Sequence, residues 1–310
     1  MKISKKLIKF YFIFLKTNNN KINIFMPYDV KKDLINARAL LKKADAILIV
    51  TGAGMSVDSG IPTYRGTNGI WTKSIQIGSE TFSYDEISSL KMWKINPNLA
   101  WGFKANFYKI MNDLEPHSGY SHLLQAIKDR YDYFVCTSNI DGYFKRAGFD
   151  QNKIYEVHGS VNFTQCMDKN CNLRNGVSPL EEVPVFDPDT FIATNLPKCQ
   201  HCGDMLRPNV SMFGDYEFYG KPYEHQRKRL NEWLYNLTKN NQSLVILEIG
   251  CGINPHSLRM SDGKMMSGEW KMPIFSNNIG TIRLNPNDSQ DDNNTIHISM
   301  GAKEGINSLF

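Results

Sequence analysis

Short, almost wholly apolar segments of strand length constrain the fold of this chain more than any other feature of its sequence. They lie at residues 46–50, 133–137, 244–250, 280–285 and 295–298, and the first three are the most apolar. Amphipathic helical patterns separate most of them, at residues 29–44, 100–111, 119–128 and 223–237. A strand that is apolar on both faces is typical of a parallel sheet covered on both sides. The alternation therefore predicts an α/β fold with a doubly wound, mostly parallel sheet.

Length and composition narrow the class of protein. With 310 residues, the chain is expected to form one large domain or two unequal ones, at roughly 150 residues per domain. Hydrophobic residues make up 41% and charged residues 22%, a balance that excludes a mainly disordered, collagen-like or coiled-coil protein. No run of about 18 uncharged apolar residues is present, so we expect no membrane partner. The net charge of +5 forms no long Lys/Arg block after residue 45, so we expect no direct nucleic-acid contact.

Residues 1–26 are set apart from the rest of the chain. They begin basic and contain a short apolar stretch, residues 7–15, which Lys9 interrupts and which is too short to span a bilayer. No small-residue cleavage site follows it, so a secretory signal peptide fits poorly. We expect a poorly ordered extension. Targeting by this segment and translation starting at Met26 are the alternatives.

A glycine-rich turn follows the first apolar strand. It reads Gly52-Ala53-Gly54-Met55-Ser56, and the loop after it contains Thr63, Tyr64 and Arg65. Glycines directly after a parallel strand let the backbone approach a pyrophosphate, whose charge the free N–H groups of the next helix can hold. Arg65 offers positive charge to a phosphate, and Tyr64 can cover a ring. The alternative is a turn whose glycines serve close packing alone.

Four of the six cysteines form two short pairs. Cys166 and Cys171 make the first pair, and Cys199 and Cys202 make the second, about 30 residues later. Two such pairs predict a tetrahedral Zn²⁺ site with four thiolates, which is structural because no position is left for water. Two independent pairs of free thiols are the alternative. Between about residues 161 and 206 the apolar strands also disappear, so we expect a small inserted zinc-binding module there. The other two cysteines, Cys136 and Cys251, are expected to pack in strands.

Several separate motifs, in one order along the chain, make this sequence resemble the sirtuins. Residues 52–66 resemble their GAGxSxxSGIPxFRG signature, 137–141 their TQNID block, 157–160 their catalytic HG segment, and 207–215 their RPxVVxFGE motif. The four paired cysteines resemble the family's zinc ligands, and shorter matches follow at 250–252, 284–285 and 300–302. The resemblance covers about residues 45 to 302.

The resemblance implies a domain plan and an activity. The plan is a catalytic domain over residues 27–302, with Rossmann-like parts at about 27–160 and 205–302, the zinc module between them, and a C-terminal tail at 303–310. The activity is NAD-dependent protein-lysine deacylation, which gives nicotinamide, free lysine and O-acyl-ADP-ribose. NAD would be the co-substrate, one Zn²⁺ the structural metal, and acyl-lysine proteins or peptides the partners.

The resemblance also assigns residues to roles. The catalytic residues would be His158 and Asn139. His158 would be the base, and its unperturbed pKa near 6.5 suits it to take a ribose hydroxyl proton near neutral pH. Asn139 and Asp141 would lie around the nicotinamide-side ribose and carboxamide, although helix capping is the ordinary role of such short polar side chains. The expected NAD contacts are Gly52, Ala53, Gly54, Ser56, Thr63, Tyr64, Arg65, Ser138, Asn139, Ile140, Asp141, Gly250, Cys251, Asn285 and Ala302. The expected substrate contacts are Val210, Phe213 and Gly214.

Some positions depart from the family pattern. The family's Gln is Ser138 here, its Asp-Phe is Thr63-Tyr64, its Thr-Ser is Cys251-Gly252 and its Glu is Asp215. The Tyr-x-x-Arg pair of the family's desuccinylase-type branch is absent, because Lys104 and Phe107 stand in its place. We therefore expect neutral acyl groups as substrates.

Two alternative functions follow from the same residues. One is a mono-ADP-ribosyltransferase or NAD glycohydrolase that uses the same NAD site. The other is a binding module that holds acyl-lysine peptides or NAD. The presumed thiolate ligands favour a reducing compartment, cytoplasmic or nuclear.

Overall fold

The structure is a computed structural model. It describes residues 30–63, 69, 74–77, 79–212, 214–252, 258, 260–261, 264–265, 277–286 and 294–310. The predicted extension at 1–26 lies outside the described residues, as do Tyr64, Arg65 and Phe213 among the predicted site residues.

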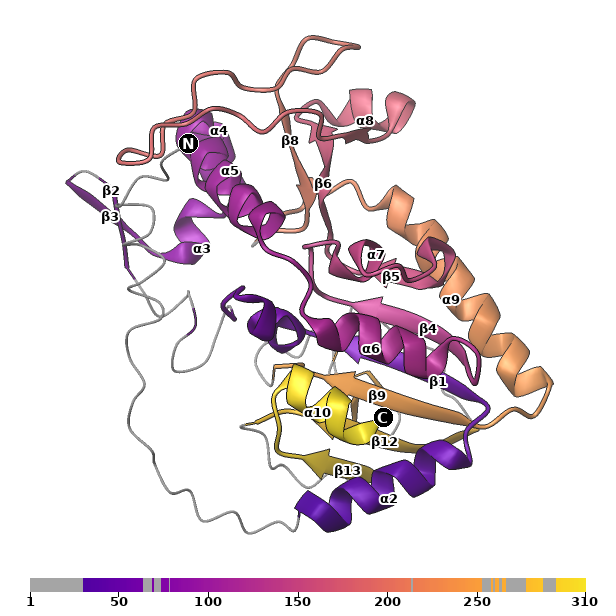
Figure 1. Cartoon of the computed structure of the whole chain (residues 1–310). Helices are drawn as coiled ribbons and strands as arrows, with labels where there is room; N and C mark the ends of the chain where they lie inside the picture. The colour runs from indigo at the N-terminus through magenta and orange to yellow at the C-terminus, as the bar shows by residue number, and fades with distance from the viewer. Residues whose placement is uncertain are drawn as a thin grey trace.

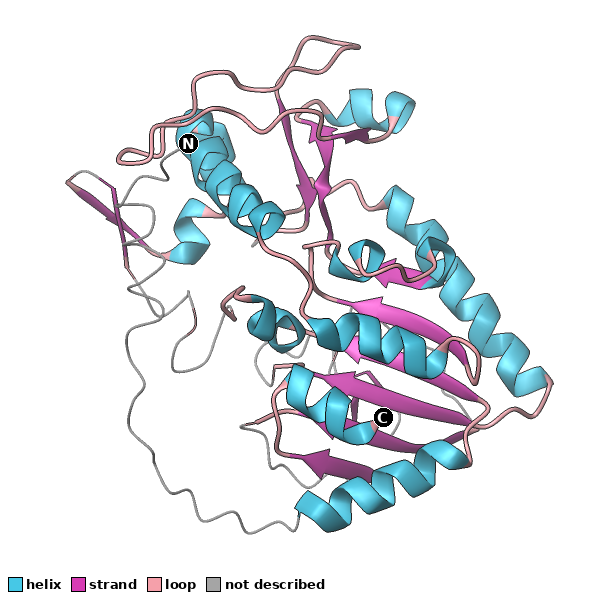
Figure 2. Cartoon of the chain, in the orientation of Figure 1, coloured by secondary structure: helices cyan, strands magenta, loops and turns pink. Residues whose placement is uncertain are grey.

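A six-stranded parallel sheet forms the larger part of the molecule (Figures 1 and 2). In sheet order its strands are β13 (Thr295–Ile298), β12 (Asn278–Leu284), β9 (Leu244–Ile249), β1 (Ala46–Thr51), β4 (Asp132–Thr137) and β5 (Ile154–Glu156). All five neighbouring pairs run parallel. The five apolar segments of the sequence thus form five of these strands, and the predicted mostly parallel sheet is confirmed.

Helices cover both faces of this sheet. Alternate side chains of a strand point to opposite faces, so Ile47 and Ile49 pack in one core cluster while Leu48 and Val50 pack in another. The first face is covered by α2 (Val30–Lys42), α6 (Ser118–Ile127) and α10 (Ala302–Leu309), and the second by α9 (Lys221–Lys239). Figure 1 shows α6 and α10 in front of the sheet. We call the sheet with these four helices the sheet domain.

The predicted C-terminal tail is a helix instead. Residues 303–309 belong to α10 (Ala302–Leu309), and Ile306 and Leu309 are buried in the core of the sheet domain. The apolar residues at 302, 306 and 309 have helical spacing, and the helix packs closely enough that a Cβ on Gly305 would lie 3.0 Å from Leu284 Cδ1.

A second, smaller unit lies beyond one edge of the sheet (Figure 1). It has a three-stranded antiparallel sheet in the order β7 (Ser178–Pro179), β6 (Gly159–Cys166) and β8 (Leu206–Val210), together with helix α8 (Lys169–Asn175). The helices α3 (Tyr84–Ile87), α4 (Leu90–Ile95) and α5 (Pro97–Asp113) pack against it. We call this whole unit the small domain.

The place of α5 differs from the predicted division of the chain. Its residues 100–111 were expected in the first Rossmann-like part, yet Trp101 and Phe103 share a core cluster with Phe191 and Ala193 of the predicted zinc module. The contact is tight, because a Cβ on Gly102 would lie 1.8 Å from the carbonyl oxygen of Phe191. An apolar helix face reveals that a helix is buried, but it does not reveal the partner.

Short elements complete the described structure. They are η1 (Ala53–Ser59), β2 (Ile75–Ile77), β3 (Glu80–Phe82), α7 (Tyr143–Arg146), η3 (Gln151–Lys153), β10 (Met260–Ser261) and β11 (Lys264–Met265). Within the described ranges, none of the helices has the length and apolar character needed to cross a membrane.

Candidate active site and metal centre

The predicted NAD contacts gather at the carboxyl ends of the central strands. The glycine-rich turn follows β1, Ser138 follows β4, Gly250 and Cys251 follow β9, and Asn285 follows β12. Strand β1 lies between β4 and β9, so the chain leaves β1 toward one side of the sheet and later returns on the other. Ligands of doubly wound sheets bind at such a switch point. The structure therefore brings these residues together at one edge.

Backbone packing explains the glycines of the turn. A Cβ on Gly54 would lie 2.5 Å from Gly250 Cα, and one on Gly52 would lie 2.7 Å from the Gly250 carbonyl oxygen. The Gly54 N–H donates to that same oxygen at 3.0 Å. Close backbone packing alone therefore explains why both positions are glycine. The 3₁₀ helix η1 begins directly after Gly52.

Ser56 is the centre of a buried polar cluster in η1. Its hydroxyl donates to Asp141 Oδ2 at 2.7 Å and accepts from Asn139 Nδ2 at 3.1 Å, and it lies 3.0 Å from the Tyr120 hydroxyl. All four side chains are buried, and burial raises the pKa of Asp141. Three predicted site residues therefore hold one another in place. Sequence analysis missed Tyr120, because an aromatic residue on the apolar face of α6 resembles ordinary core.

Asp141 and Asn139 also make local backbone hydrogen bonds. Asp141 Oδ1 accepts from the N–H of Tyr143, the first residue of α7, at 2.9 Å. The Asn139 backbone N–H donates to Thr137 Oγ1 at 3.1 Å. Each residue thus combines a local backbone role with a place in the Ser56 cluster. The neighbouring Ile140 is buried beside them.

His117 is a supporting residue that sequence analysis missed. Its Nε2 lies 2.9 Å from the Met55 carbonyl oxygen, its backbone N–H donates to Ser59 Oγ at 2.8 Å, and its Nδ1 accepts from the Gly119 N–H. Burial lowers the pKa of His117. The residue therefore ties η1 to the start of α6. Its position directly before an amphipathic helix was the available signal.

His158 lies between β5 of the sheet domain and β6 of the small domain. Its carbonyl oxygen accepts from the Ser211 N–H at 2.9 Å, and the next residue, Gly159, pairs with Val210. Burial lowers the pKa of His158 to about 4, well below the value near 6.5 of an unperturbed histidine. The side chain is therefore neutral at pH 7 and able to accept a proton, although it is a weaker base than an unperturbed histidine.

An apolar pocket lies where the two domains meet. It is narrow and partly open to solvent, and it is lined by Tyr84, Trp101, Lys104, Phe107, Tyr108, Met111, Ile140, Val161, Leu180, Pro208 and Val210. The lining includes Val210, a predicted substrate contact, and Ile140, a predicted NAD contact. None of these described lining residues carries a carboxylate. The Lys104 ammonium lies 5.7 Å from the centre of the Tyr84 ring.

The remaining predicted contacts lie in both domains. The Ser138 hydroxyl turns back to donate to the Thr51 carbonyl oxygen at 3.3 Å, and Asn285 Nδ2 donates to the Cys251 carbonyl oxygen at 3.1 Å. Ala302 is buried at the start of α10, and Thr63 is half-buried at the end of a described segment. Gly214 is exposed, with φ at +63°. Cys136 packs within β4 as expected, whereas Cys251 is buried just beyond the end of β9.

The four paired cysteines converge in the small domain. The sulfur atoms of Cys166, Cys171, Cys199 and Cys202 all lie within 4.8 Å of one another. The closest separations are 3.4 Å for Cys166–Cys202 and 3.6 Å for Cys171–Cys199, each joining one sequence pair to the other. Four thiolates about 2.3 Å from one zinc would be roughly 3.8 Å apart. The geometry fits one structural zinc ion and excludes two independent thiol pairs.

Side chains around the cysteines fix this cluster. Asn172 accepts from the Cys166 N–H at 2.8 Å and donates to the Cys166 carbonyl oxygen at 2.7 Å. Asn175 Nδ2 donates to the Cys171 sulfur at 3.3 Å. Such surrounding hydrogen bonds orient metal ligands.

The family model described as "Sir2 family" matches residues 52–232 of this chain. The chain is 36% identical over 180 residues to an NAD-dependent protein deacetylase of Bacillus subtilis, covering 57% of this chain and 67% of that protein. It is 34% identical over 182 residues to an NAD-dependent protein deacylase of Thermococcus kodakarensis, covering 58% and 64%. For an Aquifex aeolicus protein of that name the identity is 31%, covering 54% and 62%. The chain thus matches somewhat less than two thirds of the length of the last two of these relatives.

Solved structures agree on the fold. A Sir2 homologue in complex with NAD superposes with a TM-score of 0.59 and 20% identity, covering 91% of this chain and 93% of the other. A second structure, from work on the mechanism and regulation of Sir2 enzymes, gives 0.61 and 21%, covering 90% and 96%. The family match takes in more than half of the 310 residues, and on that basis the chain belongs to the Sir2 family.

Proposed function

We propose that this protein is an NAD-dependent protein-lysine deacylase that releases nicotinamide, free lysine and O-acyl-ADP-ribose. The observation that carries the proposal is that backbone hydrogen bonds from Val157 to Thr137 and from Val161 to Ile140 bring the segments that carry three features together. These are a neutral His158, the Ser56–Asn139–Asp141 cluster and the apolar pocket next to Val210. The relatives named NAD-dependent protein deacylase support the same reaction.

The switch-point edge would hold NAD as co-substrate. The turn at residues 52–54 lies at the carboxyl end of β1, where its small residues let a pyrophosphate approach the backbone. The Gly52 and Gly54 N–H groups are themselves bonded to the Ile249 and Gly250 carbonyl oxygens. Asn139 and Asp141 would face the nicotinamide-side ribose, with their side chains fixed by Ser56. A rigid polar cluster requires little rearrangement when its ligand arrives, which favours catalysis.

His158 would act as the general base. Its neutral imidazole would take the proton from a ribose hydroxyl, and that oxygen would then attack the imidate formed with the acyl-lysine amide. A well-placed general base contributes about 10²–10⁴-fold to a rate.

The acyl-lysine peptide would enter from the small domain. Strand β8 lies at one end of the order β7-β6-β8, but the Leu206 N–H and carbonyl oxygen are already bonded to Pro197 and Trp101. A peptide would therefore pair near the end of the strand, at Val210. The acyl-lysine side chain would then reach the pocket that Pro208 and Val210 line. Because this lining is largely apolar and aromatic, we infer neutral acyl groups. We further infer a reducing compartment, cytoplasmic or nuclear, in which thiolate metal ligands persist.

Mass spectrometry of the purified protein with NAD and an acetyl-lysine peptide tests the function. We expect nicotinamide, deacetylated peptide and O-acetyl-ADP-ribose in equal amounts. His158→Ala should lower turnover by about 10²–10⁴-fold while NAD affinity stays within a few-fold, whereas His225→Ala, at an exposed position on α9, should have no effect. Nicotinamide release with an intact acetyl peptide would instead favour a glycohydrolase or ADP-ribosyltransferase.

A further inference from the structure

The Ser56 hydroxyl makes three hydrogen bonds, although it has only one proton to donate. Its Oγ lies 2.7 Å from Asp141 Oδ2, 3.1 Å from Asn139 Nδ2 and 3.0 Å from the Tyr120 hydroxyl. A hydroxyl group can donate once and accept twice. These partners therefore use the whole hydrogen-bonding capacity of Ser56, and the direction of each bond follows from the chemistry of the partners.

The carboxylate of Asp141 sets these directions. An ionised carboxylate only accepts hydrogen bonds, so Ser56 donates its proton to Asp141. Ser56 then has only acceptor sites left, and both the Asn139 amide and the Tyr120 hydroxyl donate to it. The reverse order would leave the Tyr120 proton without an acceptor among the described residues. Donation therefore runs from Tyr120 through Ser56 to Asp141.

Tyr120 is well suited to be the first donor of this chain. It lies on α6 and is fully buried, and burial raises the pKa of its hydroxyl well above the usual range, to which the charge of Asp141 adds. The hydroxyl therefore keeps its proton at neutral pH. The rings of His117 and Phe144, whose centres lie 4.9 and 5.0 Å from that of Tyr120, fix the position of the ring.

The order of the bonds also fixes the Asn139 amide. An amide turned the other way would present another acceptor to Ser56, which has no proton left for it. Nδ2 is therefore directed at Ser56, and Oδ1 is turned away from it. None of the residues that the structure describes donates to this oxygen, so it can accept a hydrogen bond from a ligand hydroxyl.

Packing alone does not require the Tyr120 hydroxyl. Its ring belongs to the apolar core under the sheet, where a phenylalanine ring would fill the same space. Burying a hydroxyl costs free energy unless the group finds a hydrogen-bond partner. In the described part of the chain that partner is Ser56, at the centre of the proposed NAD site. A buried donor aimed at a site in this way gives its polar groups a defined geometry.

We propose that Tyr120 is a positioning residue for the NAD-dependent reaction. Through Ser56, its hydroxyl holds Asn139 and Asp141 in the arrangement that meets the nicotinamide-side ribose. This inference rests on the proposed deacylase function, because that function places NAD at the cluster.

A double-mutant cycle tests whether Tyr120 acts through Ser56. Tyr120→Phe removes only the hydroxyl and should lower kcat/KM for NAD about tenfold, the size of one buried hydrogen bond. Ser56→Ala should lower it about 100-fold, because it removes the contacts to Asn139 and Asp141 together. The double variant should match Ser56→Ala within about twofold, since Tyr120 then has nothing left to act through.

The control is another buried tyrosine hydroxyl of the same core. Tyr133, on β4, is 6% exposed, and its hydroxyl accepts from the Asp150 N–H at 3.4 Å. Tyr133→Phe should leave kcat/KM for NAD within about twofold of the wild type. The peptide KM should stay within about twofold in both tyrosine variants. Melting temperatures of all the variants show whether any loss of activity merely follows a loss of stability.

The outcomes separate a positioning role from a structural one. Wild-type kcat/KM for NAD in Tyr120→Phe would overturn the proposal, and so would effects that multiply in the double variant, because the two side chains would then act independently. Equal losses in Tyr120→Phe and Tyr133→Phe that follow the melting temperature would also overturn it. If the wild-type protein removes no acyl group, the proposed function fails. Calorimetric titration of the same variants with NAD then decides whether Tyr120 and Ser56 are coupled.

Discussion

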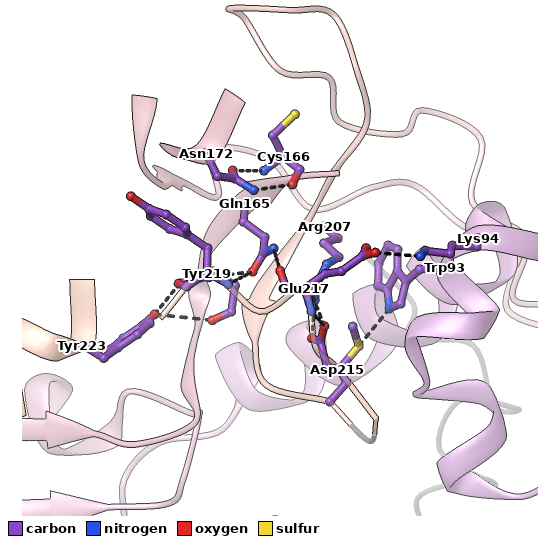
Figure 3. Close-up of polar contacts among 12 residues, drawn as sticks. Trp93, Lys94, Gln165, Cys166, Asn172, Arg207, Asp215, Glu217, Tyr219 and Tyr223 are labelled. Atoms are coloured by element: carbon purple, nitrogen blue, oxygen red, sulfur yellow. Dashed lines mark hydrogen bonds and ion pairs between the residues drawn. The ribbon is translucent and has the colours of Figure 1, made fainter. Parts of the chain in front are cut away.

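The sheet domain and the zinc-binding part of the small domain are stabilised in different ways. In the sheet domain, Ile47, Leu48 and Ile49 of the central strand are fully buried among the apolar side chains of neighbouring strands and helices. In the zinc-binding part of the small domain, the local core consists of three cysteines and Leu206. Asn172 bonds to the Cys166 backbone in that core (Figure 3), and Gln165 and Asn209 bond to each other between β6 and β8. Apolar burial therefore maintains the first region, whereas ligation and specific polar contacts maintain the second.

The difference also separates the roles of the domains. The sheet domain supplies the rigid edge at which the predicted NAD contacts meet. The small domain supplies the pocket lining and the segment next to His158. The zinc-binding part alone has a small core, and such a part can hold a precise geometry if its polar groups are satisfied.

The largest expected effect comes from removing the zinc ligands. Structural zinc contributes about 10–16 kcal/mol of apparent binding free energy in finger peptides, so Cys171→Ser should unfold the zinc-binding part and leave the sheet domain folded. Limited proteolysis and zinc analysis of the purified protein measure this. Cys136→Ala, in β4, is the matched control and should keep its zinc. Loss of both domains together would show that the small domain is needed for the sheet domain to fold.

A truncation in the core of the sheet domain should destabilise that domain and leave the zinc site intact. Ile246 is fully buried in β9 under α9, and Ile246→Ala should lower the free energy of unfolding by about 2–5 kcal/mol through the cavity that it leaves. Zinc content should not change. Ile35→Ala, at a position 56% exposed, should cost less than about 0.5 kcal/mol. Denaturant titration distinguishes these results, and zinc release by Ile246→Ala would contradict the separation of the domains.

Lowering the pH should decrease the stability of the protein, because His158 is buried at the boundary between the domains. Its pKa is about 4 in the folded protein and near 6.5 in the unfolded chain. Between these values the unfolded chain binds more protons, so the stability that this group contributes is complete above about pH 6.5 and falls as the pH drops toward 4. NMR titration of the His158 ring, with His158→Gln to assign the signal, measures the value. A midpoint near 6.5 would contradict the burial.

The smallest effect concerns the acyl group. We expect acetyl-lysine to be preferred to succinyl-lysine, because an added carboxylate would lose hydration in a largely apolar pocket. Lys104 partly offsets that loss, and Lys104→Met should widen the preference by about two- to fivefold, which is the size of a partly exposed ion pair. Competition between the two peptides measures the ratio. A preference for succinyl-lysine would show that Lys104 dominates the pocket.

The sequence by itself determined the sheet and the identity of several groups in the site. The strand at 46–50 could be predicted because a segment that is apolar on both faces is stable only between two covering layers. The paired cysteines could be predicted as one zinc site because the chemistry of four thiolates is independent of the surrounding fold. Ser56, Asn139 and Asp141 followed from the motif resemblance.

Only the tertiary structure decided which groups meet and how their surroundings change them. In the folded protein α5 packs against Phe191, and residues 302–309 form a helix. Tyr120 and His117 lie around η1. Burial also lowers the pKa of His158. A local pattern encodes which face of an element is apolar and which side chains can hydrogen-bond. The partner of that face and the burial of each polar group depend on contacts between residues far apart in the chain.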